Sequence, residues 1–187
     1  MHEDLQIIFD TVKEGMEKAV EHFVSEVNKL RIGRASASML DSVTVDYYGS
    51  RTPLNSLATV QAPDAQTIVI QPWDRSTISL IEKAVLEANL GFNPQNDGKV
   101  IKIYLPPPTE ERRRQMIKLV HREGEQARVS IRHRRHEGLE ELRKLKKEGW
   151  PEDDLKRAEQ ELDKLTRSYI EKIDQLMKKK EEDILSI

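Results

Sequence analysis

Residues 109–148 read TEERRRQMIKLVHREGEQARVSIRHRRHEGLEELRKLKKE and predict one unbroken helix. At ~1.5 Å of rise per residue, a helix of about 40 residues is roughly 60 Å long, more than a single small core can cover. Prolines 106–108 stop the preceding segment, Thr109 is suited to the N-cap, and Gly149 with Pro151 marks the end. The helix must therefore share its surface between packing and a partner outside the chain.

An apolar seam repeats every seven residues along this helix. It contains Ile117, Gly124, Ile131, Gly138 and Leu145, a spacing typical of packing against neighbouring helices. A glycine inside a helix costs up to ~1 kcal/mol relative to alanine. We therefore expect another helix to approach closely at Gly124 and Gly138.

Positive charge is concentrated beside the seam. Residues 112–135 contain eight Arg and one Lys against two Glu, a net charge of +7, whereas the whole chain carries −2. Guanidinium groups donate paired hydrogen bonds to phosphate oxygens, so this segment favours RNA as the partner.

The same charges could instead form a solvated helix face with ion pairs at i,i+3 or i,i+4 spacing. Three pairs fit this interpretation: Glu110 with Arg114, Glu125 with Arg128, and Glu140 with Lys144. Only Glu125 and Glu137 lie within a turn of the cations between Arg128 and Arg135. Arg132 and Arg135 are thus the least compensated, and we expect them to contact RNA first.

The remaining sequence predicts an α+β fold. Apolar residues recur at helical spacing over residues 1–30 and from 152 to about 185, so residues 1–30 and 106–187 form a long three-helix bundle. Residues 31–105 change to alternating strands around one helix at 76–89, which predicts a small inserted β/α/β domain. Two short connections restrict translation but permit rotation, which predicts a hinge. Its residues are Leu30, Arg31, Ile32 and Gly33 on one side, and Leu105, Pro106, Pro107 and Pro108 on the other.

Several functional classes find no support in the sequence. There is no cysteine, no long apolar run and no signal sequence, so a cytoplasmic protein without membrane contact is expected. No GxxxxGK[ST] loop or GxSxG elbow is present, so we expect neither catalysis, nor a cofactor, nor a small-molecule substrate. His133 and His136 lie one turn apart but lack a third metal ligand, so no metal site is expected.

Short segments spread over nearly the whole chain resemble the ribosome recycling factor family. They are Leu30-Arg31-x-Gly33-Arg34-Ala35-Ser36, Val45-Asp46-Tyr47-Tyr48-Gly49, Thr52-Pro53-Leu54, Ile81-Glu82-Lys83-Ala84, Leu90-Gly91-x-Asn93-Pro94, Leu105-Pro106-Pro107-x-Thr109-Glu110-Glu111-Arg112-Arg113 and Arg128-Val129-x-Ile131-Arg132. Each is weak alone, but their order and combination are specific. Arg134 departs from the resemblance, because an apolar residue is usual there.

This resemblance implies an L-shaped monomer that acts after peptide release. With elongation factor G and its GTP hydrolysis, such proteins split the ribosome and free mRNA and tRNA. The bundle would bind large-subunit ribosomal RNA near the peptidyl-tRNA site, and the GTPase would push the hinged domain. The family's important arginines correspond to Arg113, Arg132 and Arg135. Together with the charge analysis, the predicted RNA-binding set is Arg112, Arg113, Arg128, Arg132, His133 and Arg135.

A second interpretation is a helical adaptor whose Arg-rich helix binds an acidic protein. The inserted domain argues against it, because plain coiled-coil spacers seldom interrupt their heptads with a neutral module of this size.

Overall fold

A computed structural model describes residues 2–30 and 35–186, which form two separate units. One unit contains residues 2–30 and 110–186, and the other contains residues 35–109. This second unit includes residues 106–109, which the sequence pattern places in the bundle.

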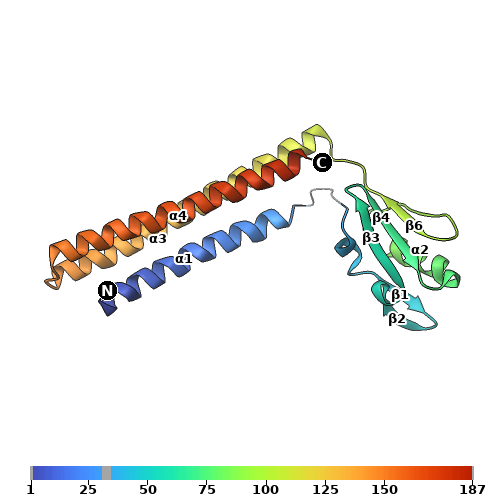
Figure 1. Cartoon of the computed structure of the whole chain (residues 1–187), viewed down its shortest axis with the longest axis horizontal. Helices are drawn as coiled ribbons and strands as arrows, with labels where there is room; N and C mark the ends of the chain where they lie inside the picture. Colours follow the sequence, from blue (N-terminus) through green and yellow to red (C-terminus); the bar gives the residue numbers. More distant parts are fainter. Residues whose placement is uncertain (1, 31–34, 187) are drawn as a thin grey trace. The chain divides into compact units, whose positions relative to one another are not determined.

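The first unit is a bundle of three long helices, α1 (Glu3–Asn28), α3 (Glu110–Lys147) and α4 (Glu152–Leu185), which lie side by side (Figure 1). All three predicted helices are confirmed. The side chain of His2 caps α1 by accepting a hydrogen bond from the amide of Asp4. Gly149 ends the turn after α3 with φ +90°, a backbone conformation that glycine adopts without strain.

The two seam glycines of α3 lie where other helices come close, as predicted. A Cβ atom at Gly138 would lie 2.8 Å from Val12 Cγ2 of α1 and 3.1 Å from Leu162 Cδ1 of α4. At Gly124 it would overlap the side chain of Met177. The missing side chains therefore allow the helices to pack at short distance.

The apolar seams shift by one residue in places. Met116 is buried on α3 where the seven-residue repeat predicts Ile117, and Thr166 and Met177 are buried on α4 next to the less buried Leu165 and Leu176. An α-helix has 3.6 residues per turn, so a strict seven-residue repeat drifts around it over many turns. Thr166 is tolerated inside because its hydroxyl donates to the carbonyl of Leu162 at 2.7 Å.

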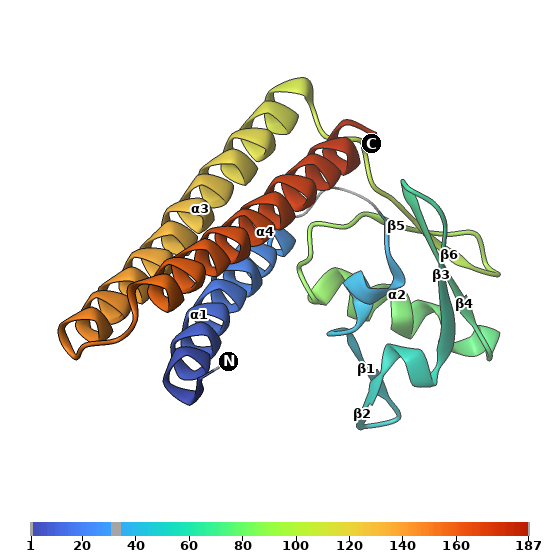
Figure 2. The ribbon, with the colours of Figure 1, turned by 60° about the vertical axis from the view of Figure 1, so that its left-hand side comes forward.

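The second unit is built from two antiparallel sheets and one helix, α2 (Ile78–Glu87) (Figure 2). A hairpin pairs β1 (Thr44–Tyr47) with β2 (Ser50–Pro53). The larger sheet has the order β3-β4-β6-β5 and contains β3 (Ala58–Asp64), β4 (Thr67–Pro72), β5 (Pro94–Asn96) and β6 (Ile101–Tyr104). Its core joins α2 to both sheets, with Ile81, Ile68 and Ile103 fully buried.

Two details of this unit differ from the sequence prediction. The sequence pattern from Leu54 to Gln61 predicts a strand, but β3 starts only at Ala58. Residues 54–56 form a 3₁₀ turn instead, in which the amide of the buried Leu54 donates a hydrogen bond to the carbonyl of Val43. The turn-rich segment after Gly91 contains β5, which pairs with β6 at the sheet edge. Three residues are too few to show an alternating pattern.

The predicted hinge is only partly described. Leu30 follows α1, and its amide donates to the carbonyl of Val27 at 3.2 Å. The amide of Leu105 donates to the carbonyl of Gln66 at 2.6 Å, and residues 106–108 have no regular structure. Arg31, Ile32 and Gly33 lie outside the described residues. None of the described helices has the length and apolar character needed to cross a membrane.

Candidate nucleic-acid interface

The cations of α3 fall into two rows with different surroundings. The inner row, His121, Arg128 and Arg135, recurs every seven residues and faces α4. Carboxylates of α4 meet each member: Glu181 contacts His121, Asp174 contacts Arg128, and Asp163 contacts Arg135. The outer row, Lys118, Arg122 and Arg132, lies on the exposed side of the helix. The two rows therefore differ in their access to a phosphate.

Arg128 is fully engaged within the protein. Its Nε donates to Asp174 Oδ1 at 2.9 Å, one terminal nitrogen also contacts Asp174, and the other donates to Glu125 at 3.1 Å. The hydrogen bond to Asp174 raises the pKa of Arg128 above its ordinary value, and the bond to Glu125 adds to this. The predicted pair with Glu125 is confirmed. Each of the three guanidinium nitrogens has a carboxylate partner, so three of the five N–H donors are used and Arg128 is less available to RNA than an unpaired arginine.

Arg135 is held in a different way. Its Nε donates to Asp163 Oδ1 at 2.7 Å, and the side chain is 36% exposed. The prediction that Arg135 lacks an acidic partner is wrong, because its partner does not belong to α3 but comes from α4. The structure gives its two terminal nitrogens no partner among the described residues. They remain able to donate to a phosphate.

The outer row has weaker internal contacts. Arg132 is 55% exposed, and its nearest carboxylate oxygen, on Glu125, is 3.8 Å away. Arg122 is 66% exposed and lies 3.8 Å from Glu123. Lys118 is exposed and has no ion pair within the described part of the chain. Arg132 therefore keeps its predicted accessibility, while Lys118 and Arg122 are candidates that we missed.

The other predicted contacts are mixed in character. Arg113, in the first turns of α3, is half-buried, and its Nε has no hydrogen-bond partner among the described residues. Arg112 is exposed. His133 is exposed, and its Nε2 lies 3.0 Å from Glu137. Cations in the first turns oppose the helix dipole, so a bound phosphate would be favourable at Arg112 and Arg113.

Arg134, at a position where the resemblance leads one to expect an apolar residue, packs against α1. Its side chain crosses α1 at Gly15, where a Cβ atom would lie 2.6 Å from Arg134 Cδ. The guanidinium reaches Glu137 at 3.2 Å. A long arginine stem can cover apolar surface while its charge stays in water. The departure from the family pattern is thus compatible with the bundle.

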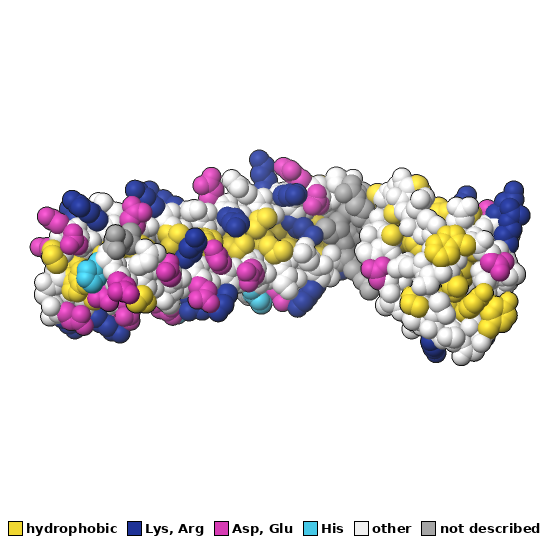
Figure 3. All heavy atoms as spheres, turned by 60° about the horizontal axis from the view of Figure 1, so that its bottom comes forward, with side chains coloured by type: hydrophobic (Ala, Val, Ile, Leu, Met, Phe, Trp, Pro, Cys, Tyr) yellow, Lys and Arg dark blue, Asp and Glu magenta, His cyan; other side chains and the backbone are white. Residues whose placement is uncertain are grey.

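Elsewhere the bundle surface carries charges of both signs. In the view of Figure 3, lysines and arginines alternate with acidic residues along the bundle, on both sides of an apolar strip. Such interspersed charges suit a solvated face better than contact with phosphates.

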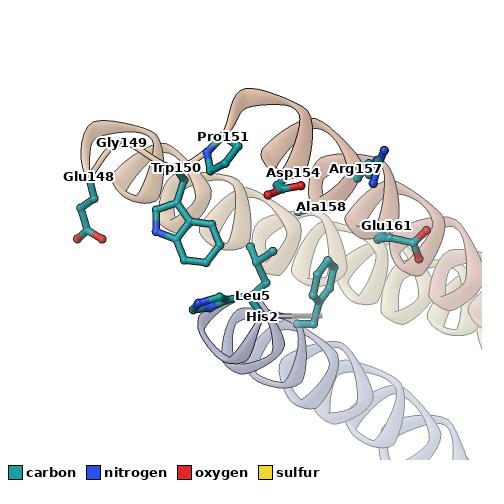
Figure 4. Close-up of a pocket in the computed structure, with 11 residues that line it drawn as sticks. His2, Leu5, Glu148, Gly149, Trp150, Pro151, Asp154, Arg157, Ala158 and Glu161 are labelled. Carbon is teal, nitrogen blue, oxygen red and sulfur yellow. The ribbon is translucent and has the colours of Figure 1, made fainter.

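A pocket of about 800 Å³ lies where the start of α1 meets the turn between α3 and α4 (Figure 4). Leu5, Trp150 and Ala158 contribute apolar surface, and Asp154 and the other charged residues lie around it. His2 lies there too, but its Nδ1 caps α1 and its ring packs edge-on against Trp150, with 4.5 Å between centroids. These contacts give His2 a structural role.

Comparisons with known proteins agree with this architecture. A sequence model described as "Ribosome recycling factor" matches residues 23–185. A ribosome-recycling factor of Flavobacterium psychrophilum is 46% identical over 187 residues and covers 100% of both chains. One from Halalkalibacterium halodurans is 47% identical over 181 residues, covering 96% of this chain and 98% of the relative.

Solved structures show the same likeness. A solution structure of ribosome recycling factor superimposes with a TM-score of 0.70 at 43% identity over the full length of both chains. Models of the T. thermophilus factor, bound with E. coli elongation factor G to the E. coli post-termination complex, give a TM-score of 0.57 at 43% identity. They cover 97% of this chain and 98% of the other.

The fold defines an α+β protein with a long three-helix bundle. The chain belongs to the ribosome recycling factor family. The helical adaptor is not favoured, because the matches over the whole chain are to ribosome recycling factors.

Proposed function

We propose that this protein recycles ribosomes after translation termination. Its bundle binds the large ribosomal subunit, and with elongation factor G it separates the subunits so that mRNA and tRNA leave. The single observation that carries the proposal is the outer row of exposed, weakly paired cations on α3 of an otherwise acidic chain. Family membership and a relative placed with elongation factor G on the post-termination complex support it.

The proposed RNA contacts are the outer row, the terminal nitrogens of Arg135, and Arg113. We remove Arg128 from the direct contacts, and Arg112 and His133 stay as secondary candidates. Five phosphate contacts correspond to a log-log salt slope near −3.5 to −4.5, from about 0.7 to 0.9 per contact. Charge supplies the attachment, while the shape of the bundle selects the site, because duplex RNA is recognised mainly by shape.

The second unit would act as the lever. It joins the bundle near Leu30 and residues 105–108, which we propose as the hinge. The energy for splitting would come from GTP hydrolysis by elongation factor G, and this chain itself would act as a monomeric, non-enzymatic factor without a cofactor. Because its substrate is the ribosome, it would work in the cytoplasm.

Light scattering of purified post-termination ribosomes tests the function. Ribosome splitting should require this protein, elongation factor G and GTP together, and omission of any one should abolish it. If the complete mixture gives no splitting at protein concentrations that saturate the ribosome, the proposed function is wrong.

A further inference from the structure

The clearest difference within the inner row lies in how each arginine meets its carboxylate. Arg128 uses Nε and both terminal nitrogens, whereas the structure gives Arg135 a partner at Nε only. Asp174 and Asp163 both belong to α4, so the two arginines meet carboxylates of the same neighbouring helix. The difference therefore lies in the local hydrogen bonds.

We propose that Asp163 is a positioning residue for RNA binding, an inference that rests on the proposed ribosomal function. Its carboxylate accepts a hydrogen bond from Nε of Arg135 at 2.7 Å, while the two terminal nitrogens have no hydrogen-bond partner among the described residues. A phosphate oxygen pair accepts hydrogen bonds in this paired geometry. Asp163 thereby prepares Arg135 for RNA, whereas Asp174 and Glu125 withdraw Arg128 from it.

The energetic reason is side-chain entropy. A long, rotamer-rich side chain that must be ordered on binding weakens affinity by a factor of about 2 to 12. Asp163 orders Arg135 before the RNA arrives, so this cost falls on folding and not on binding. The pair is about one-third exposed on each side, at 36% and 35%, so solvent screens the negative charge that Asp163 brings near the RNA.

Removal of the Asp163 carboxylate distinguishes a positioning role from a purely electrostatic effect. The two explanations predict changes in RNA affinity of opposite sign. Loss of a negative charge beside a cationic surface should by itself tighten RNA binding. We expect Asp163→Ala to weaken binding to purified large ribosomal subunits about 3- to 10-fold. Asp163→Asn keeps an oxygen acceptor for Nε and should stay within about 2-fold of the parent protein.

Asp174→Ala is the matched control on the same helix. This substitution frees Arg128 from Asp174 and removes a negative charge, so binding to the large subunit should become tighter. The log-log salt slope should become steeper by up to about 0.9, the contribution of one phosphate contact. In an Arg135→Ala background, Asp163→Ala should cause no further loss. Thermal unfolding and helical circular dichroism of each variant verify that the bundle is intact.

Unchanged or tighter binding by folded Asp163→Ala would overturn the inference. So would an equal loss in Asp163→Asn and Asp163→Ala, because the amide oxygen should restore the geometry. If the parent protein itself fails to bind the large subunit, the proposed function fails, and that outcome is distinct from failure at Asp163.

Discussion

Arg132→Ala should weaken binding to large ribosomal subunits without destabilising the bundle. Arg132 is 55% exposed, and its nearest carboxylate oxygen is 3.8 Å away, beyond hydrogen-bonding distance. Exposed pairs of this kind contribute little, so the free energy of unfolding should change by less than about 0.5 kcal/mol. Its principal interaction would therefore be with RNA.

The size of the affinity loss follows from counterion release. One phosphate contact contributes about 0.7 to 0.9 to the log-log salt slope, which at about 0.1 M salt corresponds to a five- to eightfold change in affinity. Equilibrium binding to purified large subunits at several salt concentrations gives both quantities. We expect a five- to eightfold weaker affinity and a slope that is smaller by about 0.7 to 0.9.

Arg128→Ala provides the contrast. Because its guanidinium is engaged by Asp174 and Glu125, the salt slope should hardly change. Loss of these partly buried, charged hydrogen bonds should cost about 1 kcal/mol of stability, or about 2 to 4 °C in Tm for a chain of this size. If Arg128→Ala lowers the slope as much as Arg132→Ala does, the distinction between Arg128 and the outer row is refuted.

Three further predictions concern packing, titration and the hinge. Gly138→Ala should lower the unfolding free energy by about 1 kcal/mol in urea titrations, because stiff Val12 and Leu162 crowd the new methyl and outweigh the gain in helix propensity. Gly124→Ala should cost less, since the flexible end of Met177 can move, and equal losses would refute this reasoning. Burial, with a 2.9 Å hydrogen bond to Glu17, raises the pKa of Tyr169 to about 12. The neutral phenol is favoured in the folded state, so its stabilising effect is complete below pH ~10 and is lost as the pH rises toward 12. The absorbance difference between the parent and Tyr169→Phe should therefore titrate near pH 12, and a midpoint near 10 would contradict the contact. Replacing Pro107 and Pro108 by glycine should slow ribosome splitting but leave subunit binding unchanged. An unaltered rate of splitting would argue against a stiff hinge.

The helices and their close approach could be predicted because they depend on local periodicity. Gly124 and Gly138 lie in an apolar seam, where a glycine lowers helix stability unless another helix approaches closely. The close packing of Met177 against Gly124 and of Val12 against Gly138 provides that approach. The strand at 94–96 could not be predicted, because its pairing with β6 comes from the backbone and leaves no side-chain pattern.

The candidate site was harder to predict because its electrostatics cross between helices. Charge counting along α3 found the basic segment and the exposed Arg132. It could not show that Asp163 and Asp174, which lie 28 and 46 positions further along the chain, contact Arg135 and Arg128. The seven-residue spacing of the inner row was visible, but which row faces α4 depends on packing. An outward row that includes Lys118 and Arg122 could have been derived once the buried seam was fixed.

Photo-crosslinking from α3 tests most directly whether its outer face lies on ribosomal RNA. Val129 is an apolar residue that is 57% exposed on α3, and Ile7 is a matched apolar residue of α1 that is 59% exposed. We would replace each in turn by p-benzoylphenylalanine and irradiate the protein on purified large subunits. We expect crosslinks from position 129 to large-subunit RNA and far fewer from position 7. Crosslinks from position 7 but not from 129, or from 129 to protein alone, would contradict this expectation.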